Sequence, residues 1–137
     1  MLEPTTKAID RTNLAGDFLR QEREKSNLIV EATLLKQQGL FEEASMQFGR
    51  AAEIEESLAL QLYDRGKSDK AFFHQLSALS CWAQAGDLHR ALLLGRQLAQ
   101  KDALSSAQRE QVQQYVQTLQ LRMGEWMSQW VSERVYA

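Results

Sequence analysis

Few residues in this sequence interrupt regular backbone structure. Its 137 residues include one proline, Pro4, and seven glycines. Because proline removes a backbone hydrogen bond and glycine is costly inside a helix, their scarcity permits long helices. Ala, Leu, Gln, Glu and Arg are abundant, and these residues lose little freedom on entering a helix. The composition therefore predicts an all-α protein, and no segment alternates in the way that indicates a strand.

The sequence also contains little cysteine and no long apolar run. Its one cysteine, Cys81, cannot form an internal disulfide, which is typical of proteins in a reducing compartment. No run approaches the roughly 20 apolar residues that a membrane-spanning helix requires. The first residues, MLEPTTKAIDR, are polar and acidic where a secretory signal has an apolar core. We therefore expect a cytoplasmic protein without a membrane segment.

Neither sign of charge dominates the chain. The formal net charge is −2, from 16 basic and 18 acidic residues. Basic residues are interspersed with acids, as where Arg65, Lys67 and Lys70 surround Asp64 and Asp69. A nucleic-acid-binding surface requires a basic stripe whose charge is not compensated. The sequence therefore predicts no nucleic-acid partner.

Apolar residues recur at helical spacing in five or six segments separated by turn residues. A weak pattern covers residues 1–25, after which Ser26 is placed to cap a second helix. Glycine is expected to end three helices, at Gly39, Gly66 and Gly86, and the next helices begin near Phe41, Ser68 and Asp87. The last helix begins at Ser105, which forms a capping box with Gln108. No low-complexity linker separates these segments. We expect one domain with an N-terminal helix (1–25), helical hairpins (26–102) and a C-terminal capping helix (105–134).

Three of the turns share one pattern. GLFEEA (39–44), GKSDKA (66–71) and GDLHRA (86–91) each place glycine five residues before alanine. Glycine accepts the left-handed conformation that ends a helix, and alanine one turn later lets two helix backbones approach closely. Such connections join antiparallel helices. The sequence therefore predicts stacked antiparallel hairpins, with a compact helical bundle as the alternative.

The residues around two of these turns resemble the tetratricopeptide repeat family. The first copy is carried by Ala32, Leu35, Gly39, Phe41, Ala44, Phe48 and Ala51. The second is carried by Trp82, Gly86, Leu88 and Ala91, and it departs from the family at Gly95 and Leu98, where an aromatic residue and alanine are usual. The resemblance covers residues 26–102 and implies an array of hairpins. The copies lie farther apart than the ~34 residues of the standard unit. A three-helix domain of the microtubule-interacting-and-trafficking type is a structural alternative.

The resemblance also implies a protein-binding groove lined by the first helix of each repeat. The family's groove positions fall on Ile29, Thr33, Lys36, Gln37, Phe73, Leu76, Ser80, Ala83 and Gln84. This set lacks the combination of Lys, Asn and Arg with which some members bind a peptide's C-terminal carboxylate. We therefore expect an adaptor, without catalysis of its own, that binds an apolar or amphipathic helix of a partner protein. Alternatively, Phe73 and Leu76 contact the neighbouring helix.

An aromatic stripe marks the last helix. Trp126 and Trp130 lie one helical turn apart, with Met123 and Met127 close to the same face. In a repeat protein, a terminal helix covers the core face that the last repeat would expose. These residues are expected either to cap the array or to contact a partner or second copy. The latter would make the chain a self-associating structural or regulatory subunit, joined through its terminal helices.

Residues that could carry chemistry are few and scattered. His74 and His89 lie in different helices without a second ligand at metal-binding spacing, and we expect both on the surface or in turns. Cys81 lies on a core-forming helix without a neighbouring base, so a buried inert thiol is expected. The carboxylates of residues 53–56 are expected on a solvated helix face. The sequence therefore predicts no catalytic site, no metal site and no cofactor.

Overall fold

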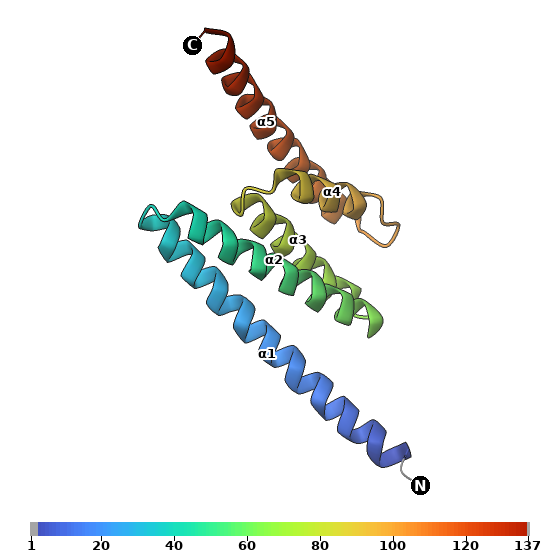
Figure 1. Ribbon diagram of the computed structural model, residues 1–137. Helices are drawn as coiled ribbons and strands as arrows, with labels where there is room; N and C mark the ends of the chain where they lie inside the picture. Colours follow the sequence, from blue (N-terminus) through green and yellow to red (C-terminus); the bar gives the residue numbers. More distant parts are fainter. Residues whose placement is uncertain (1–2, 137) are drawn as a thin grey trace.

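The computed structural model consists of five α-helices joined by short connections (Figure 1). It describes the backbone of residues 3–136 and the side chains of residues 15–133. The helices are α1 (Glu3–Gln37), α2 (Phe41–Asp64), α3 (Ser68–Gln84), α4 (Leu88–Ala99) and α5 (Ser106–Tyr136). No strand occurs between residues 3 and 136. The prediction of an all-α fold made of antiparallel helices is confirmed.

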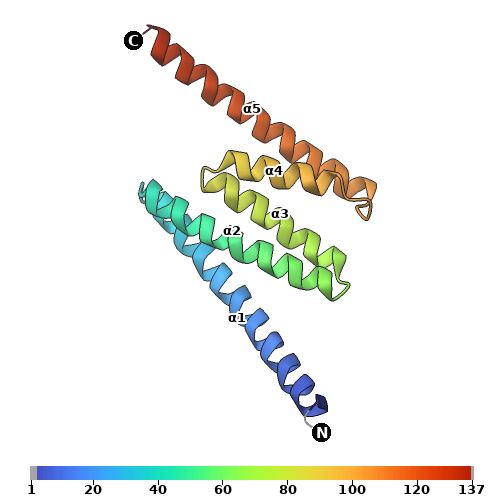
Figure 2. The same cartoon turned by 45° about the vertical axis from the view of Figure 1, so that its right-hand side comes forward.

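Each helix packs chiefly against the helices before and after it in the chain. Figure 2 shows α2, α3 and α4 side by side, with α1 and α5 on the two outer sides. The outer helices are also the longest, at 35 and 31 residues, while α4 has 12. The N-terminal part of α1 and the C-terminal part of α5 therefore extend beyond their neighbours (Figure 1). None of the described helices is long and apolar enough to cross a membrane.

Three of the corners between helices are built in the same way. Gly39, Gly66 and Gly86 have φ angles of +80°, +74° and +83°, where a side chain would be strained. At the first corner the Gly39 N–H donates to the Lys36 carbonyl at 3.1 Å, and the next N–H donates to the Leu35 carbonyl at 2.9 Å. The other two corners repeat this pair of bonds, which satisfies carbonyls at the helix end. The prediction that these glycines end helices is confirmed.

The alanine of each repeated turn is buried at the start of the following helix. Ala44, Ala71 and Ala91 expose 3%, 0% and 0% of their surface. The N–H of each donates to the carbonyl of the residue four positions earlier, which begins the new helix. The small side chain of alanine lets the two helices of each hairpin approach closely at this point. The repeated pattern therefore encodes close packing as well as chain reversal.

The connection between α4 and α5 contains no glycine and uses side chains instead. Ser105 and Gln108 form the predicted capping box, since the Gln108 N–H donates to Ser105 Oγ at 3.1 Å and the Ser105 N–H donates to Gln108 Oε1 at 3.0 Å. Arg109 donates to the carbonyl oxygens of Ala99 and Lys101. These bonds satisfy backbone groups that the end of α4 would leave unpaired.

The predicted helix boundary at Ser26 is wrong, because α1 runs through it without interruption. Residues 3–25 and 26–37 therefore belong to one helix. Serine is only modestly unfavourable inside a helix, and no glycine or proline nearby reverses the chain. On either side of it, Lys25 and Leu28 face α2: Lys25 forms an ion pair with Glu55, and Leu28 is 7% exposed. Packing along α2 therefore outweighs the capping preference of Ser26.

The predicted cap of α3 is also wrong. Lys67, not Ser68, holds the N-cap position, and its side chain makes no capping hydrogen bond. The glycine corner before it already determines the path of the chain. By contrast, Asp87 caps α4 as predicted, because its Oδ1 accepts a hydrogen bond from the Arg90 N–H at 3.1 Å.

The main core lies along α2 and α3 and is closed by the inner faces of the other helices. Phe48, Phe72 and Leu79 expose 2% or less. α5 closes the core on the far side with Val112 and Leu119, at 0% and 1%. The first part of α5 therefore covers this side of the core. A smaller cluster near the α2–α3 corner consists of Ala59, Leu62 and Ala71, with Phe18 and Tyr63 packed against it.

Candidate functional site

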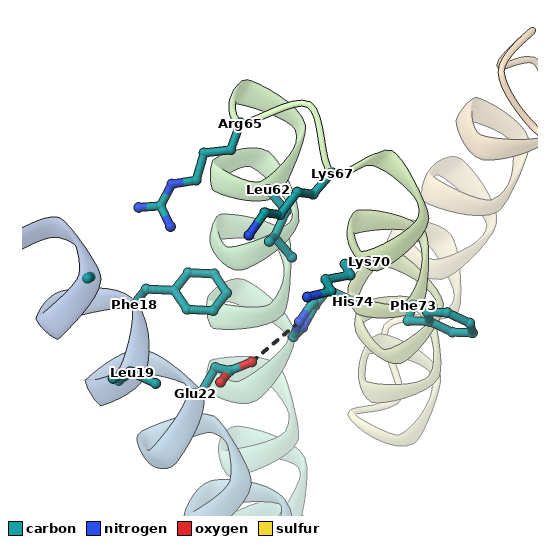
Figure 3. A pocket seen from close by; sticks show the side chains of 10 residues that line it. Phe18, Leu19, Glu22, Leu62, Arg65, Lys67, Lys70, Phe73 and His74 are labelled. Atoms are coloured by element: carbon teal, nitrogen blue, oxygen red, sulfur yellow. Dashed lines mark ion pairs between the residues drawn. The ribbon is translucent and has the colours of Figure 1, made fainter. Parts of the chain in front are cut away.

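A pocket of about 510 Å³ opens between α1 and the corner that joins α2 to α3 (Figure 3). We call it the α1–α3 pocket. Its apolar lining is Ala15, Phe18, Leu19, Leu62 and Phe73, and its polar lining is Glu22, Arg65, Lys67, Lys70 and His74. Ligand-binding pockets in proteins measure roughly 300–1,000 Å³. The volume therefore suits side chains of a protein ligand.

α1 supplies the apolar wall of the pocket because it extends beyond the α2–α3 corner. Phe18 packs against the small cluster of buried residues at that corner. Its ring meets the imidazole of His74 edge-on, with centroids 6.4 Å apart and an interplanar angle of 82°. The neighbouring Leu19 is 60% exposed. This wall therefore combines an anchored aromatic ring with an aliphatic side chain that a ligand can cover.

Three cationic side chains surround the pocket: Arg65, Lys67 and Lys70. The Arg65 guanidinium lies over the Phe18 ring, 5.6 Å from its centroid. In Figure 3 the amino groups of Lys67 and Lys70 point from the corner toward α1. Within residues 15–133, no carboxylate forms an ion pair with any of the three. These three cations therefore bring positive charge to the pocket that no ion pair among the described side chains neutralises.

This group of cations was not predicted, because acidic residues are interspersed with them in the sequence. Asp64 and Asp69 do not line the pocket, although they are close to the cations along the chain. The corner at Gly66 separates the basic and acidic side chains in space. One feature of the sequence could have indicated this group of cations: Arg65, Lys67 and Lys70 lie within a few residues of the predicted corner at Gly66.

Beneath the pocket, a buried carboxylate links three helices. Glu55 of α2 is 1% exposed, and its Oε1 lies 2.9 Å from His74 Nδ1 on α3 and 3.5 Å from Lys25 Nζ on α1. His74 Nε2 also lies 3.6 Å from Glu22 Oε1, the pair drawn as a dashed line in Figure 3. A buried carboxylate without such partners would be strongly unfavourable. These four residues, the Glu55 cluster, therefore tie α1 and α3 to α2.

Two surface predictions are wrong at this cluster. The His74 side chain is 16% exposed and takes part in the cluster, whereas His89 is exposed as predicted. Glu55 is buried, while Glu53 and Glu56 are exposed as predicted. The missed signal is helical spacing, because Glu55 shares a face with apolar residues. That face contains Ala51, Ala52, Leu58 and Ala59.

Cys81 is a buried thiol, as predicted, and it is 3% exposed. Burial raises its pKa to about 11, and the negative charge of Glu55 contributes to the rise. A hydrogen bond from Ser77 and the charge of Lys25 lower the pKa by less. The thiol is therefore protonated at neutral pH and unreactive. No group of three or more His, Cys, Asp and Glu side chains in the described part of the chain is arranged to hold a metal ion.

The nine predicted groove residues are distributed over the array. Phe73 lines the α1–α3 pocket, is 66% exposed, and points away from Phe18 in Figure 3. Ile29 and Leu76 are partly buried against the main core, which is the helix contact considered as the alternative for Leu76. Of the others, Thr33, Lys36, Gln37 and Gln84 are exposed, Ser80 is half-buried and Ala83 is buried. The extended groove stays a prediction.

A second pocket of about 510 Å³ lies between the α3–α4 corner and α5. Ala83, Met123 and Trp126 contribute to its lining. Met123 packs against the main core, whereas Trp126, Met127 and Trp130 are 58%, 48% and 43% exposed. The predicted aromatic face is therefore divided. Met123 belongs to the part of α5 that packs on the array, Trp126 lies beside the α3–α4 corner, and Met127 and Trp130 follow toward the C-terminal end of α5.

Comparison with protein-family models, curated proteins and solved structures gives no significant match. The sequence and geometry of the chain are therefore the basis for assigning a function. They direct attention to the α1–α3 pocket, where an apolar wall meets uncompensated positive charge.

Proposed function

We propose that the protein is an adaptor that binds a segment of a partner protein in the α1–α3 pocket and has no catalytic activity of its own. The observation that carries this proposal is the pairing of exposed apolar surface at Leu19 with cations at Lys67 and Lys70 that no carboxylate of the described chain neutralises. A ligand that matches both features carries a large apolar side chain beside carboxylates. An amphipathic acidic helix or an extended acidic segment meets this requirement.

The hairpin architecture supports the proposal. Tetratricopeptide-like proteins bind partners on the first helices of successive hairpins, and by the predicted assignment those helices are α1 and α3. Both helices line the pocket, with Phe18 on one and Phe73 on the other. We therefore propose that the chain works as a tetratricopeptide-like array and that this pocket forms one end of its binding groove.

The energetics favour specific and reversible binding. Burial of one large apolar side chain contributes roughly 1.5–3 kcal/mol. Each exposed ion pair with Lys67 or Lys70 adds at most about 1 kcal/mol. Charge complementarity mainly selects the correct ligand and accelerates its association. A partner therefore needs both the apolar anchor and its acidic neighbours to be recognised.

We also propose that the adaptor acts in a reducing compartment such as the cytoplasm. Its one cysteine, Cys81, is buried and has no second cysteine with which to pair. The stability of the fold therefore does not depend on disulfide formation.

Self-association through α5 is a second candidate function. The observation that favours it is the exposure of Trp126, Met127 and Trp130 in the C-terminal half of α5. Large aromatic side chains are enriched at protein interfaces because they bury much apolar area. Light scattering of wild type and of Trp126→Ala/Trp130→Ala tests this candidate. Equal masses for both proteins at all concentrations would contradict it.

Site-directed photo-cross-linking tests the adaptor proposal. A photoreactive phenylalanine analogue replaces Leu19 at the pocket, and in a control protein it replaces Leu121, which is 70% exposed on α5. After irradiation in a lysate of the native cells, we expect a discrete partner to be captured from position 19 and not from position 121. Reversal of charge with Lys67→Glu/Lys70→Glu should reduce that yield several-fold. Identical captures from both positions, or no effect of the reversal, would refute the proposal.

A further inference from the structure

The corner between α1 and α2 exposes an apolar and acidic segment. Leu40 and Phe41 are 42% and 64% exposed. Glu42 and Glu43 follow in the first turn of α2, and both are exposed. Among residues 15–133, no cation forms an ion pair with either carboxylate. This segment, residues 40–43, which we call the acidic corner, therefore combines an aromatic ring with two uncompensated negative charges.

The acidic corner has the complementary chemistry to the α1–α3 pocket. The pocket offers an apolar wall at Phe18 and Leu19 beside uncompensated cations, and the corner offers Phe41 beside carboxylates. Phe41 is the first residue of α2, directly after the α1–α2 corner, and its ring is exposed where another molecule can reach it. Complementary charge around an apolar anchor is the usual arrangement of a specific interface.

The acidic corner cannot enter the pocket of its own chain. The two lie at opposite ends of α2, because the corner precedes Phe41 and the pocket is lined by Leu62 and Arg65. α2 contains 24 residues, and at 1.5 Å per residue it separates them by about 36 Å. Occupation of the pocket by this segment therefore requires a second molecule.

We propose that the α1–α3 pocket of one copy binds the acidic corner of a second copy, with Phe41 against the apolar wall and Glu42 and Glu43 against Lys67 and Lys70. This inference rests on the pocket of the proposed function and names one occupant of it. The contact is heterologous, since the two copies use different surfaces, and it extends head to tail unless it closes into a ring. A partner protein with the same chemistry competes for the pocket.

The proposed contact is small, so we expect weak self-association with a dissociation constant on the order of 100 µM. Sedimentation velocity of the full chain from about 10 µM to about 500 µM measures it at low ionic strength, where the exposed charges are least screened. The average mass should rise with concentration and fall again when salt is added. Phe41→Ala should weaken association about tenfold, because it removes the apolar anchor.

Charge exchange provides the decisive experiment. Glu42→Lys/Glu43→Lys reverses the corner, and Lys67→Glu/Lys70→Glu reverses the pocket. Each variant alone should be monomeric. A mixture of the two should associate, because the wild-type pocket of one variant matches the wild-type corner of the other and the two reversed surfaces also match each other. The quadruple variant should regain self-association. Glu53→Lys and Arg96→Glu are matched controls at exposed positions elsewhere. They should associate like wild type, and far-UV circular dichroism confirms that all variants are folded.

Three results would overturn the inference. The first is a wild type that is monomeric at all concentrations. The second is a mixture of the two reversed variants that does not associate. The third is self-association that is abolished by Trp126→Ala/Trp130→Ala but not by charge reversal at the corner or the pocket. A monomeric wild type that still captures a partner from position 19 would refute self-recognition and leave the adaptor function standing. If position 19 captures no partner while self-association is intact, the adaptor function is refuted and self-recognition stands.

Discussion

Gly95→Ala should destabilise the protein because α4 has no room for a methyl group at this position. Gly95 is buried where α4 packs on both α3 and α5. A Cβ atom there would lie 2.5 Å from Val116 Cγ2 and 3.2 Å from Leu79 Cδ1. Carbon atoms pack at roughly 3.5–4.0 Å, so the first contact is a severe overlap. Val116 is β-branched and in a helix, so it cannot rotate away cheaply.

Two opposing effects determine the size of this change. Overpacking of a core costs about 1–3 kcal/mol. Replacement of glycine by alanine inside a helix returns about 1 kcal/mol. We therefore expect Gly95→Ala to lower the free energy of unfolding by up to about 2 kcal/mol, which corresponds to a fall in Tm of up to roughly 8 °C. Val116→Ala in the same molecule should restore most of this loss, because it removes the overlapping atom.

Urea denaturation followed by circular dichroism measures these differences. The matched control is Gly49→Ala in α2, where the new Cβ would lie 3.6 Å from Trp82 Cζ3, an ordinary contact. That variant should be as stable as wild type or more stable. The reasoning fails if Gly95→Ala has the same free energy of unfolding as the control Gly49→Ala. It also fails if the changes in this free energy caused by Gly95→Ala and Val116→Ala add, within about 0.5 kcal/mol, in the double variant.

Four further predictions concern the interior and the last helix. Glu55→Ala should lower the free energy of unfolding by about 3–5 kcal/mol, because it leaves Lys25 and His74 without their buried partner. The control Glu53→Ala should change it by less than about 0.5 kcal/mol. Equal urea midpoints for the two variants would show that the Glu55 cluster does not hold the helices together. The pKa of Cys81 is raised from 9.0 to about 11, so the thiol should react with iodoacetamide at pH 8 about 100-fold more slowly in the folded chain than in urea. Because the pKa of Cys81 is lower in the unfolded chain, the thiol proton leaves the unfolded chain at a lower pH than the folded chain. As the pH rises from 9 to 11, wild type should therefore lose up to about 3 kcal/mol of stability relative to Cys81→Ala. Parallel plots of stability against pH for the two proteins would refute this. Met123→Ala should lower the free energy of unfolding, measured by thermal denaturation, by about 1–3 kcal/mol, because Met123 packs against the core. Met127→Ala, at a 48% exposed position, should lower it by less than about 0.5 kcal/mol. Equal effects would show that the α5 face is not divided into a packed and an exposed part.

The helices and most of their ends could be predicted because they depend on local interactions. Gly39, Gly66 and Gly86 end helices through the conformational freedom of glycine, which no distant contact is needed to explain. Ser105 and Gln108 satisfy each other's backbone groups three residues apart. There are two exceptions. At Ser26 a local preference for capping was outweighed by packing of α1 along α2. At the start of α3, Lys67 and not Ser68 holds the N-cap position.

The candidate site depended on which residues meet across helices. Phe18, Arg65 and Lys70 lie in three different elements, and no spacing along the chain indicates that they line one pocket. Of the predicted groove residues, Phe73 lines this pocket, while Ile29 and Leu76 pack against the core. The resemblance to a repeat family assigns positions on a helix, but the actual tilt and length of α1 determine what those positions contact.

The sequence by itself determined the helical content, the glycine corners and the order of the hairpins, because backbone hydrogen bonds and turn conformations act over a few residues. The tertiary structure decided that Glu55 is buried, that the cations of the α2–α3 corner separate from the neighbouring acids, and that α5 divides into a packed and a projecting part. These features depend on burial and on distances between side chains far apart in the chain. Such distances exist once the helices have packed, and the function proposed for the α1–α3 pocket depends on them.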